Sequence, residues 1–141
     1  MIRMAVRVLD RLFLVVYGAT SPTDRAWCEY LDLVKRQGID GTIQLVVTDG
    51  GGPTAAQRRA LGELLAGRSV PVAVVSGSLP VRALVTAMSW FNRSIKAFPS
   101  RELRCAVAYL EIPASRVELI EAELGKLRRA IEHTQQAKGG P

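Results

Sequence analysis

One short run constrains the fold of this chain more than any other feature. Residues 70–75, Val-Pro-Val-Ala-Val-Val, contain no alternation of polar and apolar side chains. A strand of that kind is apolar on both faces, which is typical of a parallel sheet covered by helices on each side. Pro71 is expected near its start, because proline cannot donate to a neighbouring strand. The run therefore predicts an α/β domain with a mostly parallel sheet.

The remaining patterns supply the other elements of such a domain. Residues 2–9 alternate loosely and residues 12–17 are continuously apolar, so an N-terminal hairpin turning at Asp10 and Arg11 is expected. Strands are then expected at 43–47, 70–75 and 95–98, and helices between Ser21 and Gly38, between Thr54 and Gly67, over 79–91 and from Ser100 to Leu110. This βαβαβα order predicts right-handed crossovers.

Small polar residues mark the expected starts of three of these helices. Ser21 precedes Pro22, a residue that suits the first helical position, and Thr54 is followed three residues later by Gln57. Ser100 precedes the last of the three. We expect Ser21, Thr54 and Ser100 to cap their helices, because a side-chain oxygen there accepts from an unpaired backbone N–H.

An additional amphipathic helix is expected over residues 113–137, after an α/β domain at 1–112 and before a disordered tail at 138–141. Apolar residues recur there at alternating spacings of three and four, which is a coiled-coil seam: Val117, Ile120, Leu124, Leu127 and Ile131. Gly125 weakens this helix by about 1 kcal/mol relative to alanine. Two alternatives remain open. The seam packs on its own domain, or it pairs with a second copy in a homodimer.

Length and hydropathy limit the location of the protein. The longest apolar run, Leu12 to Gly18, is shorter than the roughly 20 residues of a membrane-spanning helix. Arg3 and Arg7 precede this run as in a signal peptide, but Asp10 and Arg11 interrupt the apolar segment that such a peptide needs. We expect a cytoplasmic protein with no membrane span.

Charge and cysteine content exclude further classes. The net charge is +6, yet the basic residues are scattered and are not interleaved with aromatic ones, so no nucleic-acid partner is expected. Cys28 and Cys105 are expected on buried helix faces, where an unpaired cysteine behaves as a small apolar residue. That arrangement suits a reducing compartment.

The hairpin and the alternating helices and short strands resemble the STAS domain, in particular the SpoIIAA-like group of bacterial anti-sigma-factor antagonists. The resemblance covers about residues 4–112 and depends on residues 45–59 (LVVTDGGGPTAAQRR) and on residues 84–91 (LVTAMSWF) before 95–98 (IKAF). It implies a non-enzymatic regulatory module without a cofactor, which binds a regulatory or kinase-like protein.

Phospho-regulated members of that family carry a serine, preceded by aspartate, at the start of the helix after the third strand. Here Thr54 takes the comparable helix start, and Pro53 precedes it in place of aspartate. Thr54 is therefore the candidate phosphorylation site that the resemblance implies. Its alternative role is that of a plain helix cap.

A candidate partner or anion site lies around the glycine run. Glycines let consecutive N–H groups approach an anion above a helix start, and two arginines follow one turn later. The candidate residues are Asp49, Gly50, Gly51, Gly52, Thr54, Arg58 and Arg59. Neither phosphate-loop signature is present, so a flexible turn between strand and helix is the alternative.

The helix expected at 79–91 has more apolar surface than one interface needs. We expect Val81, Leu84, Val85 and Met88 to face a protein partner. A rival hypothesis is a small-ligand or lipid-binding domain, in which a groove beside this helix holds an apolar molecule and Arg58 or Arg59 meets its acidic head.

Catalysis has little support in the sequence. An enzyme centred on Asp49 and Thr54 is the third hypothesis, but no motif supports it. The single histidine, His133, is expected to be exposed near the end of the last helix, without a second histidine for a metal site. No metal and no enzymatic activity are expected.

Overall fold

The computed structural model describes residues 2–89 and 94–139, with side chains up to residue 132. These residues form one five-stranded sheet in the order β1-β2-β3-β4-β5. The strands are β1 (Met4–Leu9), β2 (Leu12–Tyr17), β3 (Ile43–Thr48), β4 (Val72–Ser76) and β5 (Ile95–Phe98). β1 is antiparallel to β2, and the other neighbours are parallel. The predicted α/β class, with its hairpin and mostly parallel sheet, is confirmed.

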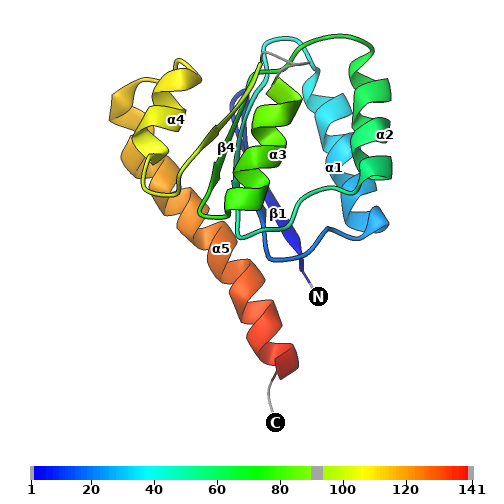
Figure 1. Ribbon diagram of the computed structural model, residues 1–141, viewed down its shortest axis with the longest axis vertical. Helices are drawn as coiled ribbons and strands as arrows, with labels where there is room; N and C mark the ends of the chain where they lie inside the picture. The colour runs from blue at the N-terminus through cyan, green and yellow to red at the C-terminus, as the bar shows by residue number, and fades with distance from the viewer. Residues whose placement is uncertain (1, 90–93, 140–141) are drawn as a thin grey trace.

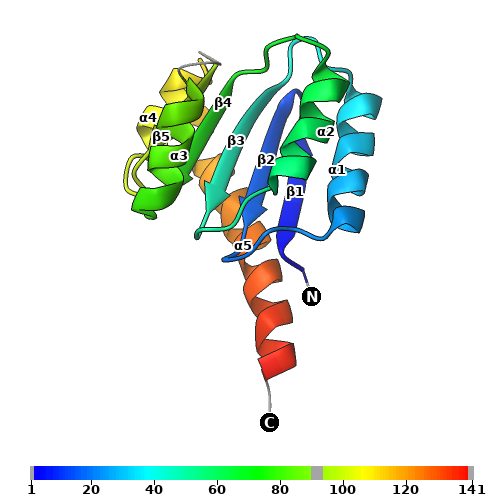
Figure 2. The ribbon, with the colours of Figure 1, turned by 45° about the vertical axis from the view of Figure 1, so that its right-hand side comes forward.

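Helices cover both faces of the sheet (Figures 1 and 2). Consecutive right-handed crossovers that advance in one direction place their helices on the same face. That face carries α1 (Asp24–Gln37), α2 (Ala55–Leu65) and α3 (Leu79–Ser89), and the other carries α4 (Leu103–Tyr109), the short 3-10 helix η1 (Ala114–Arg116) and α5 (Val117–Gly139). Residues 90 and 91, predicted to end the third helix, lie outside the described residues.

The central strands are buried on both sides, as their apolar runs predict. Every residue of β2 is buried. Phe13 and Val15 pack toward α1 and α2, whereas Leu14 and Val16 pack toward α4 and α5. The core therefore consists of one apolar cluster on each face of the sheet.

The helix starts confirm one predicted cap and correct two. Thr54 caps α2 within a capping box. Thr23, not Ser21, caps α1 by accepting from the Ala26 N–H at 3.1 Å. The α4 helix begins after Glu102, whose side chain makes no cap hydrogen bond. The helix starts this late because the chain first forms a turn from Pro99 to Glu102. Ser100 therefore caps no helix.

A contact made by the preceding residue, Pro22, explains why Thr23 caps α1. The Pro22 carbonyl accepts a hydrogen bond from Gln57 Nε2 at 3.0 Å. Gln57 also donates to Asp24 Oδ1 at 3.0 Å, so this buried amide joins the starts of α1 and α2. Pro22 is held outside the helix by that contact.

The seam of the C-terminal helix belongs to the core of its own chain. Val117, Ile120, Leu124 and Ile131 are buried against the sheet and α4, and Leu127 packs beside them. The interpretation of these residues as an oligomer seam is therefore corrected, since their apolar face is already covered. α5 continues to Gly139, so the predicted tail is helical at 138 and 139, and residues 140–141 lie outside the described residues.

A buried carboxylate also fixes α5 on the sheet. The Glu123 side chain is 8% exposed and forms an ion pair with Arg7 Nε of β1 at 3.4 Å. Lys126 Nζ lies 3.3 Å from the other carboxylate oxygen. Two cations therefore compensate the charge that α5 buries.

The two cysteines are free and exposed, which corrects their predicted burial. On α1 the buried stripe runs through Trp27, Tyr30 and Val34. Cys28 is one residue from that stripe, a rotation of about 100° around a helix of 3.6 residues per turn. Cys105 stands beside the buried Ala106 in the same way.

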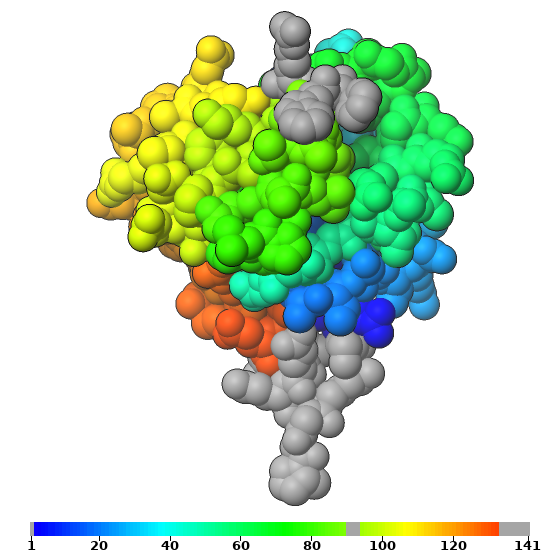
Figure 3. Space-filling model, in the orientation of Figure 1, coloured from blue at the N-terminus to red at the C-terminus, as the bar shows by residue number. Residues whose placement is uncertain are grey.

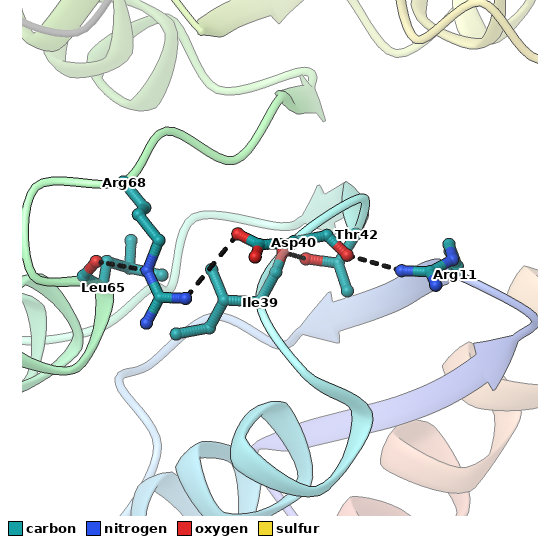
Figure 4. A network of polar contacts seen from close by, with 6 residues as sticks. All are labelled: Arg11, Ile39, Asp40, Thr42, Leu65 and Arg68. Atoms are coloured by element: carbon teal, nitrogen blue, oxygen red, sulfur yellow. Dashed lines mark hydrogen bonds and ion pairs between the residues drawn. The ribbon is translucent and has the colours of Figure 1, made fainter.

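A polar network ties the loops at the amino-terminal ends of the parallel strands (Figure 4). Arg68 donates to the Leu65 carbonyl at 3.3 Å and forms an ion pair with Asp40 at 3.6 Å. Arg11 of the hairpin turn donates to the Asp40 carbonyl, and Thr42 donates to that of Ile39 at 2.7 Å. The end of α2 is thereby joined to the loop after α1.

Candidate functional site

A cavity of about 610 Å³ lies between α2, α3 and the sheet. In the space-filling view a gap separates the side chains of α3 from those of α2 (Figure 3). The floor comes from β3 and β4, and the two helices form the walls. The main lining residues are Tyr17, Gln44, Val46, Thr48, Val72, Val74, Arg58, Leu61, Leu65, Val81, Leu84, Val85, Met88 and Ile95. Its volume is within the roughly 300–1,000 Å³ typical of small-molecule sites.

The cavity exists because two neighbouring helices do not pack fully on the sheet. Gln57 is the buried residue of α2, and Val85 is that of α3. Leu61 and Leu65 of α2 remain half-buried, although they face the sheet. Both helices thus present apolar side chains to a space that no described residue fills.

The predicted partner face of α3 is the wall of this cavity. Val81, Leu84, Val85 and Met88 all line it, and Val85 is only 5% exposed. Val85 therefore offers little surface to a protein partner. Leu84 remains 50% exposed, so it contributes to both the cavity and the outer surface.

Arg58 and Arg59 have different surroundings, although they are adjacent on α2. Arg58 is half-buried and lines the cavity, whereas Arg59 is exposed and does not. Arg58 donates to the Pro53 carbonyl at 3.0 Å, and it has no carboxylate partner in the described part of the chain. No Asp or Glu of that part lines the cavity, so Arg58 leaves its charge uncompensated there.

The glycine loop is a close-packed turn. The Gly50 N–H donates to Thr48 Oγ1 at 3.1 Å, and the Gly51 N–H donates to the Gly18 carbonyl at 2.9 Å. A Cβ on Gly51 would lie 2.3 Å from the Thr20 carbonyl oxygen, so only glycine fits there. Gly50 and Gly51 therefore cannot cradle an anion with these N–H groups, and Gly52 lines the cavity beside them.

The structure does not bring the remaining predicted site residues to the cavity. Asp49 lines a separate pocket of about 90 Å³ together with Arg128 of α5. Thr54 is exposed, and its hydroxyl accepts from the Gln57 N–H at 3.1 Å. An enzyme centred on Asp49 and Thr54 therefore has no common pocket. The side chain of His133 lies outside the described residues.

Sequence reasoning missed the polar side chains on the α1 side of the cavity. Tyr17, Tyr30 and Gln44 line it, and the Tyr30 hydroxyl donates to Gln44 Oε1 at 2.7 Å. Burial raises the pKa of Tyr30 to about 12. Burial and the neighbouring Tyr30 raise the pKa of Tyr17 further. Both phenols are therefore neutral near pH 7. The signal in the sequence was Gln44, a polar residue within an apolar strand.

The described residues contain no group of three metal-ligating side chains, and no helix among them is long and apolar enough to cross a bilayer. The fold and the site define an α/β domain with an apolar cavity, and Arg58 is the uncompensated cation among the described residues that line it. Comparison with family models, curated proteins and solved structures finds no match for this chain.

Proposed function

We propose that this protein binds, without catalysis, a small apolar molecule with an acidic head group in the cavity between α2 and α3. The observation that carries the proposal is Arg58, a half-buried cation that lines an apolar cavity without a carboxylate partner. A buried charge is normally paired, because removing it from water has a large cost. An acidic ligand would supply the missing charge.

The shape of the cavity supports an amphiphile over a fully polar ligand. Val46 and Val74 form the middle of the floor, and leucines of α2 face valines and Met88 of α3 across it. Arg58, Thr48 and the glycine loop gather at the end where β3 stops. An extended molecule would place its apolar chain along the floor and its acidic head at Arg58.

We expect Arg58→Gln to weaken the binding of hexadecanoic acid by about 10- to 100-fold, the size of one or two charge-assisted hydrogen bonds. Glutamine keeps a polar, though shorter, side chain and removes the charge. Competition against a fluorescent fatty-acid probe measures the affinity of the purified chain.

The adjacent arginine provides the matched control. Arg59→Gln removes the same charge from an exposed position outside the cavity, so affinity should stay within about twofold of wild type. The neutral methyl ester should bind wild type and Arg58→Gln equally. Equal losses in the two arginine variants would indicate a nonspecific charge effect and contradict the proposal.

A second candidate function is the regulatory protein-binding module that the STAS resemblance implies, acting in a bacterial cytoplasm. The observation that favours it is the exposed apolar surface on α3, where Leu79 is 71% and Leu84 is 50% exposed. Leu79 does not line the cavity, so it serves no ligand directly. Phosphorylation of the exposed Thr54 would regulate such a module.

Leu79→Glu separates the two functions. We expect it to reduce capture of a regulatory or kinase-like partner from native cells by at least about tenfold, since it introduces a charge into an apolar contact. Fatty-acid affinity should be unchanged. The measurement is quantitative mass spectrometry of proteins that co-purify with the tagged chain. Undiminished capture by the variant would remove α3 from the partner surface.

A further inference from the structure

Gln44 is a buried amide with unused donors in the cavity. It is 8% exposed and lines the cavity on β3. Its Oε1 accepts from the Tyr30 hydroxyl at 2.7 Å, whereas its Nε2 donates to no residue in the described part of the chain. A primary amide has two N–H donors, and a purely hydrocarbon ligand in the cavity would cover them without a partner, which is unfavourable. Valine or isoleucine would suit this strand position better if the cavity received only a hydrocarbon.

The position of Gln44 separates it from the acidic head. Thr48 follows Gln44 by four residues on the same face of β3, a distance of about 13 Å at 3.3 Å per residue. Thr48 lies at the glycine-loop end, where the Pro53 carbonyl accepts from Arg58. Val46 lies between the two polar positions. The cavity is therefore polar at two places along its length and apolar between them.

We propose that the ligand is a long-chain acid with a second oxygen, a hydroxyl or keto group, roughly ten carbons from the carboxylate, and that Gln44 Nε2 donates to this oxygen. The spacing follows because an extended chain with bonds of about 1.5 Å advances only about 1.3 Å per bond. This inference rests on the proposed function, since it assigns the head group to Arg58. Tyr30 is the positioning residue, because its hydroxyl holds Oε1 and leaves Nε2 for the ligand.

The test compares three acids that differ only in the presence or position of one hydroxyl group: hexadecanoic acid, its 10-hydroxy derivative and its 3-hydroxy derivative. We expect the wild-type chain to bind the 10-hydroxy acid about tenfold more tightly than the other two, as one additional hydrogen bond would produce. Competition against the same fluorescent probe measures all three.

The double variant Tyr30→Phe/Gln44→Leu tests the assignment to Gln44. Removing both partners leaves no unpaired group, so the fold should persist and the variant should still bind hexadecanoic acid. We expect it to bind the three acids within about twofold of one another. Tyr109→Phe, on α4 across the sheet, is the matched control and should keep the preference.

The outcomes separate this inference from the proposed function. Equal binding of the three acids by the wild-type chain would overturn the inference and leave the proposed function intact. A preference that survives in the double variant would overturn the role of Gln44. Failure of the wild-type chain to bind any of the three acids would overturn both proposals.

Discussion

Replacing Val46 with tryptophan is expected to weaken fatty-acid binding by at least about 100-fold while the domain stays folded. Val46 is half-buried in the middle of the cavity floor, between Gln44 and Thr48 on β3. A tryptophan side chain would fill the space that the apolar chain of the ligand needs. Because the cavity of about 610 Å³ receives the ring, the overpacking that normally destabilises a core does not arise.

The measurement is hexadecanoic-acid affinity together with the thermal unfolding midpoint. Val46→Ile is the control, since it adds one methylene and should change the affinity only a few-fold. Tryptophan also suits a strand, so a loss of binding would not reflect poor strand propensity. Wild-type affinity in a folded Val46→Trp variant would show that the ligand does not occupy this cavity.

Truncating Ile120 to alanine is expected to lower the free energy of unfolding by about 3 kcal/mol, within the range measured for large-to-small changes in cores. Ile120 is fully buried between α5 and the sheet. Leu119, its neighbour on the same helix, is 47% exposed, so Leu119→Ala should change the free energy by less than about 0.5 kcal/mol. Urea-induced unfolding measures both variants.

The same experiment tests the corrected role of the C-terminal seam. A seam that packs within one chain gives an unfolding midpoint that does not depend on protein concentration, whereas a seam that pairs two chains gives one that does. We expect no dependence over a hundredfold range of concentration. A midpoint that rises with concentration, or equal effects of Ile120→Ala and Leu119→Ala, would contradict the packing described for α5.

Much of the fold followed from local patterns. The continuous apolar runs of β2 and β4 predicted strands buried on both faces, because such burial leaves no position for a polar side chain. Thr54 and Gln57 predicted the capping box of α2, since both bonds of that motif join residues three apart. Both features depend on neighbours in the sequence, and the sequence therefore determined them by itself.

The caps of α1 and α4 were mispredicted because distant or competing contacts decided them. Gln57, which is 35 residues after Pro22 in the chain, donates a hydrogen bond to the Pro22 carbonyl. This contact places the start of α1 at Thr23. Packing on the sheet likewise decides which face of α1 is buried. Trp27 lies on that face, and Cys28 does not. Such contacts leave no local signal in the sequence.

What the sequence determined by itself was the class of fold, the order of its elements and the presence of apolar surface on α3 and α5. Tertiary structure alone decided how that surface is used: α5 covers the sheet, whereas α3 and α2 enclose a cavity beside it. It also decided that Arg58 lines this cavity and Arg59 does not. The physical reason is that burial depends on the gap between elements distant in the chain, which the pattern within one helix does not specify.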